Sequence, residues 1–389
     1  MYFVVKAMST QFEEMSAENS TANETLSNTT NALLDHSTEM AAFSDPSWQL
    51  AITIEFYFRY AVLAVAIFGT ATNATVLYAL IAYNANEAKK RAVNLLIIHQ
   101  NVIDLSSCIL LVIAYSIGNK TDLTGALGDF LCIFFISANA TYWALYASVI
   151  NLMSLTIERY LKVVYPFWSK KHIKRWMIYA AMIFAWVIGF PFTIPVGYAT
   201  SFVQDGICFI YHDWESEAVK MTFGAFTNVV FFLLPMIIFI YCYGHIVVVM
   251  RRQMRVMAAH NVEGSSQMNA SQIQSKRVKW NIIKTMIIVS VAFVICWFPN
   301  NVYFMIMDTT ETDSLNLYIG YFPTMFLVYF NVCINPFIYA TKHEGVKQKL
   351  ARLMICSKCK GPTAVGDSSK NSTNNAGRMQ QTPAGSVRA

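Results

Sequence analysis

Seven long apolar stretches alternate with polar segments along this chain of 389 residues. The apolar stretches cover residues 56–82, 93–117, 131–157, 176–200, 221–250, 284–307 and 315–341. Each holds about twenty residues or more, which as a helix is long enough to cross a bilayer core about 30 Å thick. Because lipid offers no partner to an unpaired backbone N–H or C=O group, these stretches must be helices, and a barrel of strands is excluded. The pattern therefore predicts an all-α membrane protein, a bundle of seven transmembrane helices.

Basic residues are unevenly distributed between the two sides of these helices. Of the 29 Lys and Arg residues, 25 fall in the segments after the first, third, fifth and seventh stretches or at the ends that border them. The other four lie on the opposite side: Lys6, Arg59, Lys120 and Lys220. Cationic loops stay in the cytoplasm, so we expect a multi-pass protein of the plasma membrane with its N-terminus outside and its C-terminus inside. Since topology explains the basic residues, nothing favours nucleic acid as a partner.

The two ends of the chain are polar and are expected to be disordered. The N-terminal end is rich in Ser, Thr, Asn and Glu and carries glycosylation sequons at Asn19, Asn23 and Asn28. The C-terminal end is rich in Ser and Thr, so phosphorylation there is compatible with disorder. The resulting organisation is an extracellular N-terminus, a membrane domain, a short amphipathic helix lying on the membrane lipid and a cytoplasmic tail, at 1–54, 55–341, 342–356 and 357–389 respectively.

Five strongly polar residues lie deep inside the predicted helices. They are Asn73, Asp104, Ser148, Asn331 and Asn335, and Asp104 is the only acid in the middle of a span. Each costs several kcal/mol in lipid unless it is paired or hydrated, so we expect one internal cluster. For the Asn residues, a network that only packs helices together is as good an interpretation as a functional site. For Asp104 a functional site is favoured, because a carboxyl group without a basic partner must be protonated, hydrated or bound to a small cation.

Prolines and one charged triplet suggest a bundle that moves. Proline residues interrupt the fourth to seventh helices and are expected to kink them, at Pro195, Pro235, Pro299 and Pro336. The triplet Glu158, Arg159 and Tyr160 ends the third helix on the cytoplasmic side. On its own, the triplet is equally compatible with an ordinary ion pair at the membrane interface.

Taken together, these features resemble the rhodopsin-like (class A) G-protein-coupled receptors over about residues 55–356. The motifs occur in the family's order: Asn73, Asp104, Glu158-Arg159-Tyr160, Pro166, Trp186, Pro235 with Tyr243, Cys296-Trp297-Phe298-Pro299 and Asn335-Pro336-Phe337-Ile338-Tyr339. The whole set in register is highly specific for this family.

The resemblance implies a receptor, not an enzyme, that activates a heterotrimeric G protein through an outward swing of the sixth helix. Glu158 would hold Arg159 at rest, and Trp297 would form the floor of the ligand pocket. The implied activation switch consists of Glu158, Arg159, Tyr160, Pro166, Tyr243, Trp297, Pro299, Asn335, Pro336 and Tyr339. Receptor kinases and arrestin are implied as further partners.

The family's sodium site is implied at Asp104, Ser148, Asn331 and Asn335, so Na⁺ is expected as an allosteric ion and no cofactor is required. Three positions depart from the family pattern. Thr72 replaces the usual Gly before Asn73, and His99 replaces the usual Asn of the second helix. Lys279 stands where some members carry an acid that pairs with Arg159, so a salt bridge between helices three and six is not expected, which would raise basal activity.

The eight cysteines fall into three groups. Four lie inside predicted spans and are expected to be packing residues: Cys108, Cys242, Cys296 and Cys333. Cys132 and Cys208 face the oxidising side, and the resemblance implies that they form the family's disulfide, which ties the second outer loop over the pocket. Cys356 and Cys359 lie inside, where palmitoylation would anchor the amphipathic helix, while a single CxxC is weak evidence for zinc.

The expected ligand pocket carries no charge. Thr141 replaces the acid of amine receptors, and Tyr329 replaces the Schiff-base lysine of visual pigments, so both ligand classes are disfavoured. The pocket is expected to contain Thr141, Tyr142, Trp297, Asn300, Asn301, Phe304 and Tyr329. Acids gather instead in the outer loops, at Asp205, Asp213, Glu215, Glu217, Asp308, Glu311 and Asp313.

These acids would attract a basic peptide, as in a neuropeptide receptor, although they could equally serve only to keep the outer surface soluble. Two alternatives remain. One is a receptor for a non-amine small molecule. The other, more distant, is a membrane transporter, a class that usually shows repeated halves that are not visible here.

Overall fold

The structure is a computed structural model that describes ten parts of the chain. They are residues 46–85, 95–117, 123–204, 206–210, 214, 216–262, 270–309, 315–342, 346–347 and 349–351. The chain divides into two compact units, Met1–Leu350 and Ala351–Ala389, and the long apolar helices belong to the first. The sequons at Asn19, Asn23 and Asn28 and the cysteines Cys356 and Cys359 lie outside the described residues, so glycosylation and palmitoylation stay predictions.

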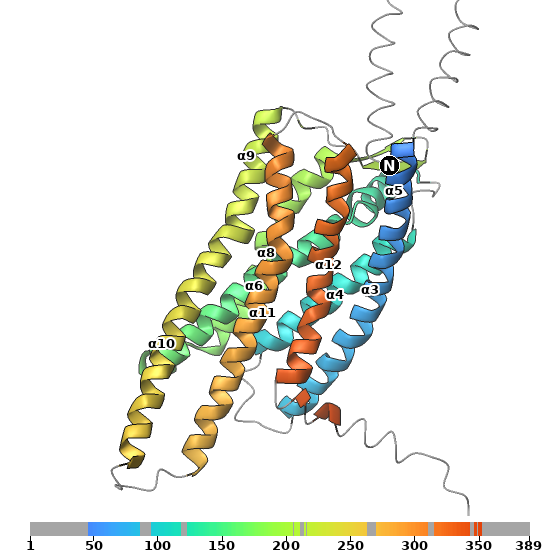
Figure 1. Cartoon of the computed structure of the whole chain (residues 1–389). Coiled ribbons are helices and arrows are strands. Elements are labelled where there is room, and N and C mark those ends of the chain that lie inside the picture. Colours follow the sequence, from blue (N-terminus) through green and yellow to red (C-terminus); the bar gives the residue numbers. More distant parts are fainter. Residues whose placement is uncertain are drawn as a thin grey trace, which may run out of the picture. The chain divides into compact units, whose positions relative to one another are not determined.

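Within the described residues, seven helices are long and apolar enough to cross a membrane (Figure 1). The elements that form them are α3 (Pro46–Ala85), α4 (Leu95–Ile117), α6 (Asn139–Val164), α8 (Arg175–Thr200), α9 (Glu217–Asn228) continued by η2 (Val229–Leu233) and α10 (Leu234–Val262), α11 (Ala270–Thr309) and α12 (Leu315–Lys342). The predicted bundle of seven transmembrane helices is thereby confirmed. A short helix, α7 (Pro166–His172), connects α6 to α8 and begins at Pro166, where the fixed φ of proline favours a first helical position.

The third predicted helix, 131–157, is divided near its outer end. Helix α5 (Gly125–Leu131) runs into the π-helical turn η1 (Cys132–Ile136), and α6 begins only at Asn139. Ala138 between them has φ 61°, a left-handed backbone conformation that interrupts a right-handed helix. The side-chain nitrogen Nδ2 of Asn139 donates to the carbonyl oxygen of Ile133 at 2.8 Å and to Ser137 Oγ at 2.8 Å. The apolar pattern could not show this break, because it is made by local hydrogen bonds of short polar side chains.

The helices on either side of residues 263–269 are longer than the apolar pattern predicts. Helix α10 continues to Val262 and α11 begins at Ala270, beyond the predicted limits of 250 and 284. Side chains 251–256 are exposed, and no Gly or Pro interrupts the helix before Gly264. Because water can solvate polar side chains on a helix, α10 continues beyond the end of its apolar stretch. At the other end of α10, the π-helical turn η2 comes just before Pro235. Proline has no backbone N–H group to donate, and the wider π-helical turn accommodates this missing hydrogen bond.

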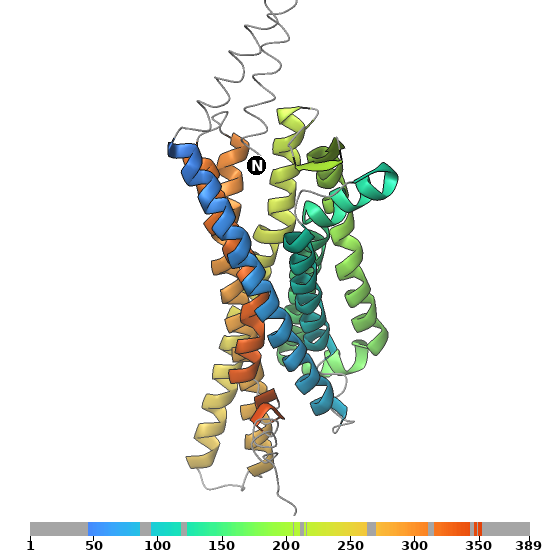
Figure 2. The same cartoon turned by 90° about the vertical axis from the view of Figure 1, so that its right-hand side faces the viewer.

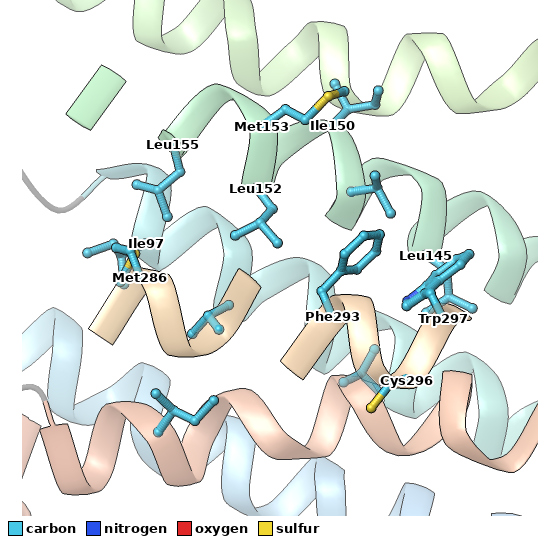
Figure 3. Packing of buried hydrophobic residues seen from close by; sticks show 14 of the residues in the cluster. Ile97, Leu145, Ile150, Leu152, Met153, Leu155, Met286, Phe293, Cys296 and Trp297 are labelled. Atoms are coloured by element: carbon cyan, nitrogen blue, oxygen red, sulfur yellow. The ribbon is translucent and has the colours of Figure 1, made fainter. Parts of the chain in front are cut away.

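Helix α6 is the most deeply buried of the seven. In its most apolar window 72% of the residues are buried, against 17% for α3, 28% for α8 and 22% for the span formed by α9 and α10. It packs against α4, α8 and α10, while α3 packs against α4 and α12 (Figure 2). Figure 3 shows the resulting core, in which Leu145 of α6 lies beside Trp297 of α11, and Phe293 of α11 faces α6. Helix α6 is therefore in contact with neighbouring helices on several sides.

A small hairpin lies at the end of the bundle that the sequence predicts to be extracellular. Strand β1 (Ser201–Gln204) pairs antiparallel with β2 (Ile207–Ile210), and Gly206 has φ 75° in the turn. Cys208 in β2 forms a disulfide with Cys132 in η1, the pairing that the family resemblance implies. Both cysteines are fully buried with Leu123 and Ile136. The hairpin is thus joined covalently to the segment that leads into α6.

The segment after α12 is described only in part. Residues 346–347 and 349–351 are helical, and Val346 is fully buried in the main core with Leu350 packed against it. The predicted amphipathic helix 342–356 extends past the described residues, so it stays a prediction.

Gly69 in α3 is required by a close approach between helices. A Cβ atom there would lie 2.7 Å from Cys108 Sγ and would also collide with Cys333 Sγ. We expect Gly69→Ala to lower the free energy of unfolding by about 1–3 kcal/mol, the usual cost of overpacking. Gly244→Ala in α10 is the matched control, because no atom lies within 4 Å of its added Cβ. The measurement is the thermal unfolding midpoint of both purified variants, and equal midpoints would contradict this account of α3 packing.

Candidate functional site

The carboxyl group of Asp104 is the centre of a buried polar cluster. Asn335 Nδ2 of α12 donates to its Oδ2 at 2.8 Å, and Ser148 Oγ of α6 donates to its Oδ1 at 3.2 Å. Gln100 Nε2, one turn earlier on α4, donates to the same Oδ1 at 3.2 Å and also to Ser148 Oγ. Asp104 is 0% exposed, so these three side chains provide its polar environment. Three of the four predicted sodium-site residues are thus brought together.

A row of hydrogen bonds leads from this cluster to α8. Asn151 Nδ2 of α6 donates to Gln100 Oε1 at 2.8 Å, and its Oδ1 lies 2.8 Å from His99 Nδ1. Trp186 Nε1 of α8 donates to His99 Nε2 at 3.1 Å. An indole N–H group can only donate, so His99 accepts at Nε2 and carries its proton on Nδ1. The row therefore has one direction, from Trp186 through His99, Asn151 and Gln100 to Asp104.

Sequence reasoning missed Gln100 and Asn151, although a signal for Gln100 was available. Gln100 precedes Asp104 by four residues in the second predicted span, so the two share a helix face. Asn151 follows Ser148 by three residues on the next helix, which again puts both on one face. His99 does have a role: it departs from the family pattern and joins Trp186 to this row.

The other predicted deep polar residues are placed differently. Asn331 is buried, and neither its Oδ1 nor the Oδ1 of Asn335 has a hydrogen-bond partner among the described residues. Asn73 Nδ2 donates to the carbonyl oxygens of Gly69 at 3.0 Å and Val332 at 3.1 Å, so it joins α3 to α12 instead of reaching Asp104. The expected single cluster is therefore two adjoining networks.

The charged triplet forms its ion pair within one helix. Arg159 Nε lies 3.2 Å from Glu158 Oε2, and both side chains are less than a tenth exposed. Lys162, one turn further along α6, forms a second ion pair with Glu158 through Oε1. Sequence reasoning did not include Lys162. One carboxylate is thus shared between two cations. The side chain of Lys279 lies outside the residues whose side chains are described.

Tyrosines join α6 to α10 near this pair, at the end of the bundle that the sequence predicts to be cytoplasmic. The hydroxyl groups of Tyr243 and Thr156 form a hydrogen bond of 2.9 Å, and Tyr160 bonds to His245 Nδ1 at 3.1 Å. Tyr339 of α12 is fully buried. Of the predicted switch prolines, Pro299 lies inside α11 and Pro336 lies inside α12.

Several expected ligand-contact residues on α6, α11 and α12 form a neutral layer of aromatic and amide side chains. Tyr142 Oη lies 3.3 Å from Met325 Sδ, and Asn300 Nδ2 donates to the same sulfur at 3.0 Å. The buried side chain of Tyr329 has its ring centroid 6.0 Å from that of Tyr115. All of these groups are uncharged at neutral pH.

Two of the expected contacts link helices at the outer side of this layer. Asn301 donates to the carbonyl oxygen of Trp297 at 2.8 Å and accepts from Asn228 Nδ2 at 3.0 Å, which joins α11 to α9. Phe304 contacts Tyr321 edge-on at 6.5 Å between ring centroids. Thr141 is buried, and its Oγ1 has no hydrogen-bond partner among the described residues.

Charge at the outer side is described at few positions. Of the seven loop acids, only Glu217 has a described side chain, and it forms an exposed ion pair with Lys220 at 3.4 Å. Arg59 of α3 is half-buried, and its Nε donates to the carbonyl oxygen of Tyr115 at 3.1 Å. A guanidinium group therefore lies beside the neutral layer, a feature that sequence reasoning counted only as topology.

The arrangement of these motifs agrees with a comparison against known protein families. The family described as 7 transmembrane receptor (rhodopsin family) matches residues 72–339. This chain belongs to that family. The expected resemblance is confirmed, and so is the expectation that the protein is a receptor and not an enzyme, because the members of this family are receptors.

Several members of the rhodopsin family resemble the chain over most of its length. The Substance-K receptor of Canis lupus familiaris is 24% identical over 346 residues, which cover 86% of this chain and 84% of that receptor. Proteinase-activated receptor 3 of Rattus norvegicus is 27% identical over 277 residues, 67% of each chain. Lysophosphatidic acid receptor 1-B of Xenopus laevis is 23% identical over 234 residues, 59% of this chain and 60% of that one.

Asn151 is the residue on which the polar row of this receptor depends. Asn151→Leu would leave Gln100 Oε1, the N–H group of His99 and the carbonyl oxygen of Leu96 without their partner. We expect the free energy of unfolding to fall by about 1–3 kcal/mol, because these buried groups lose a hydrogen bond without gaining water. The measurement is the thermal unfolding midpoint of the purified receptor.

The matched control for this prediction is Ser154→Ala on the same helix. The hydroxyl of Ser154 donates at 2.9 Å to the carbonyl oxygen of Ile150, a bond within α6. The control should keep its midpoint, and a loss as large as that of Asn151→Leu would show that the row carries no special stability.

Proposed function

We propose that this rhodopsin-family receptor lies in the plasma membrane with its N-terminus outside and transmits the binding of an extracellular ligand to a heterotrimeric G protein. Its family supports the receptor role, and the 25 basic residues on the expected inner side support the orientation. Activation would move the inner end of α11 outward and expose Arg159 to the G protein. Receptor kinases and arrestin would act on the cytoplasmic side.

The observation that carries this proposal is the buried ion pair at the inner end of α6. Arg159 is 6% exposed, and the Glu158 carboxylate that pairs with it is also held by Lys162. Because this pair lies within α6, it restrains the side chain of Arg159 and not the position of α11. Phe293 and Trp297 of α11, with ring centroids 5.4 Å apart, face the core against α6 and would repack during that motion (Figure 3).

For the ligand, we propose a basic peptide. Seventeen of the 23 acidic residues lie on the expected outer side, where they would raise the local concentration of a cationic ligand. The uncharged layer of Tyr142, Asn300 and Tyr329 would then bind aromatic and amide groups of the peptide. One of the relatives is named as a Substance-K receptor, a receptor of the neuropeptide type, which agrees with this candidate.

A second candidate ligand is a non-amine small molecule that carries an anionic group. Its support is the half-buried guanidinium of Arg59, which donates to Tyr115 with one N–H group and has others for a phosphate or carboxylate. A relative named as a lysophosphatidic acid receptor agrees with this candidate.

The experiment that tests both is nucleotide exchange on purified G proteins with the receptor in lipid nanodiscs. The ligand panel comprises amidated basic peptides in one arm and lysophospholipids in the other, and Arg59→Gln is tested in each arm. Faster exchange with a peptide, unaffected by Arg59→Gln, would support the first candidate. Faster exchange with a lysophospholipid, lost in Arg59→Gln, would support the second. No acceleration with any G protein would contradict the coupling.

Glu158 is expected to restrain basal signalling. Glu158→Gln removes the negative charge that holds Arg159, so basal nucleotide exchange should rise, by about fivefold if the pair biases the resting state by 1 kcal/mol. Lys162→Gln removes a competitor for the same carboxylate and should lower basal exchange. Lys170→Gln removes one charge from an exposed position of α7 and should leave it unchanged. A rise in the Lys162 variant would contradict this competition.

The outer acids are expected to control how fast a basic peptide is captured. With all seven replaced by Asn or Gln, the association rate constant should fall by about tenfold or more at low salt, while dissociation changes little. Surface plasmon resonance at two salt concentrations measures both constants. The same association rate in the variant, or a rate independent of salt, would rule out electrostatic capture.

A further inference from the structure

The side chain of Gln100 stands where a cation would contact Asp104. Gln100 Nε2 donates to Asp104 Oδ1 at 3.2 Å and to Ser148 Oγ, and these two oxygens are 3.2 Å apart. Both belong to the set that the family resemblance assigns to sodium. The other carboxylate oxygen, Oδ2, accepts from Asn335 Nδ2 at 2.8 Å. Each oxygen that would bind the ion most strongly therefore already has a hydrogen-bond donor.

A sodium ion does not fit this arrangement while Gln100 keeps its position. An ion needs oxygen lone pairs, and the amide nitrogen of Gln100 presents hydrogens to the same point instead. Within the four residues that the resemblance assigns to sodium, the oxygens that lack a donor among the described residues are Asn331 Oδ1 and Asn335 Oδ1, which belong to neutral amides on α12. Three hydrogen bonds meanwhile stabilise the negative charge of Asp104 without an ion.

The amide of Gln100 cannot reverse its direction at low cost. Its Oε1 accepts from Asn151 Nδ2, whose own Oδ1 accepts from the Nδ1–H group of His99. At the α8 end of the row, the indole of Trp186 can only donate. At the other end, the carboxylate of Asp104 can only accept. Turning the amide around would place two oxygens together at Asp104 and two donors together at Asn151. The row therefore holds the amide N–H groups towards Asp104.

We propose that Gln100 is an internal substitute for the sodium ion, so that Asp104 in this receptor is held by an amide of its own chain and does not take up sodium. The allosteric ion expected from the family would thus be replaced by a residue on the same helix as Asp104. A side chain of similar size without N–H groups at position 100 removes the competitor and restores an ion site. The inference rests on the contacts of α4, α6, α8 and α12 and requires neither ligand binding nor G-protein coupling.

The test is the thermal unfolding midpoint of the full-length receptor as NaCl replaces choline chloride at constant ionic strength. The buried free thiols of Cys108, Cys242, Cys296 and Cys333 report unfolding when they react with a thiol-sensitive dye. The unmodified receptor should show no sodium dependence. In Gln100→Leu the midpoint should rise with sodium, by about 2 °C for each tenfold increase above Kd. KCl in place of NaCl controls for a general cation effect.

Two further variants keep the outcome decisive. Gln100→Met has nearly the length of Gln and replaces the leucine variant if that protein does not fold. Adding Asp104→Asn to either variant should abolish the sodium effect, because the ion would lose its carboxylate. A sodium-dependent midpoint in the unmodified receptor would overturn the proposal, as would midpoints independent of sodium in both Gln100 variants. Neither result bears on G-protein coupling, so failure of this inference is distinguishable from failure of the proposed function.

Discussion

The bundle depends on one constraint: a carboxyl group in the middle of a membrane must find hydrogen-bond donors within the protein. Asp104 is fully buried, and its donors come from α4, α6 and α12. Because Gln100 is itself held by Asn151 and, through His99, by Trp186, the requirement extends to α8. Four helices are thus fixed in mutual register by a single row of polar side chains.

The same row separates the part of the bundle that is fixed from the part that can move. Its members lie on α4, α6, α8 and α12, whereas α11 faces α6 mainly with apolar side chains such as Met286, Phe293 and Trp297 (Figure 3). Apolar contacts can be exchanged at lower cost than buried hydrogen bonds, because no unsatisfied group is left behind. An outward motion of α11 is therefore compatible with an intact Asp104 cluster, and it breaks no contact of the Arg159–Glu158 ion pair, because both residues lie on α6.

Much of this architecture could be predicted from the sequence, because each transmembrane helix is encoded locally by about twenty apolar residues. The break at Ala138 could not, since it depends on hydrogen bonds of Asn139. The motifs likewise identified Asp104, Ser148 and Asn335 but not Gln100, because position 100 is not part of the family motifs and the role of Gln100 follows from its contacts with Asp104, Ser148 and Asn151. The sharing of Glu158 between Arg159 and Lys162 also required side-chain geometry.

A high-resolution experimental structure of the receptor in high sodium would show whether the Gln100 amide takes the place of the ion. We expect density for this amide in contact with Asp104 and Ser148, with no ion between these two side chains. An ion bound to the Asp104 carboxylate, with the Gln100 side chain turned away and its bond to Asn151 broken, would contradict the role of Gln100 as the partner of the buried carboxylate.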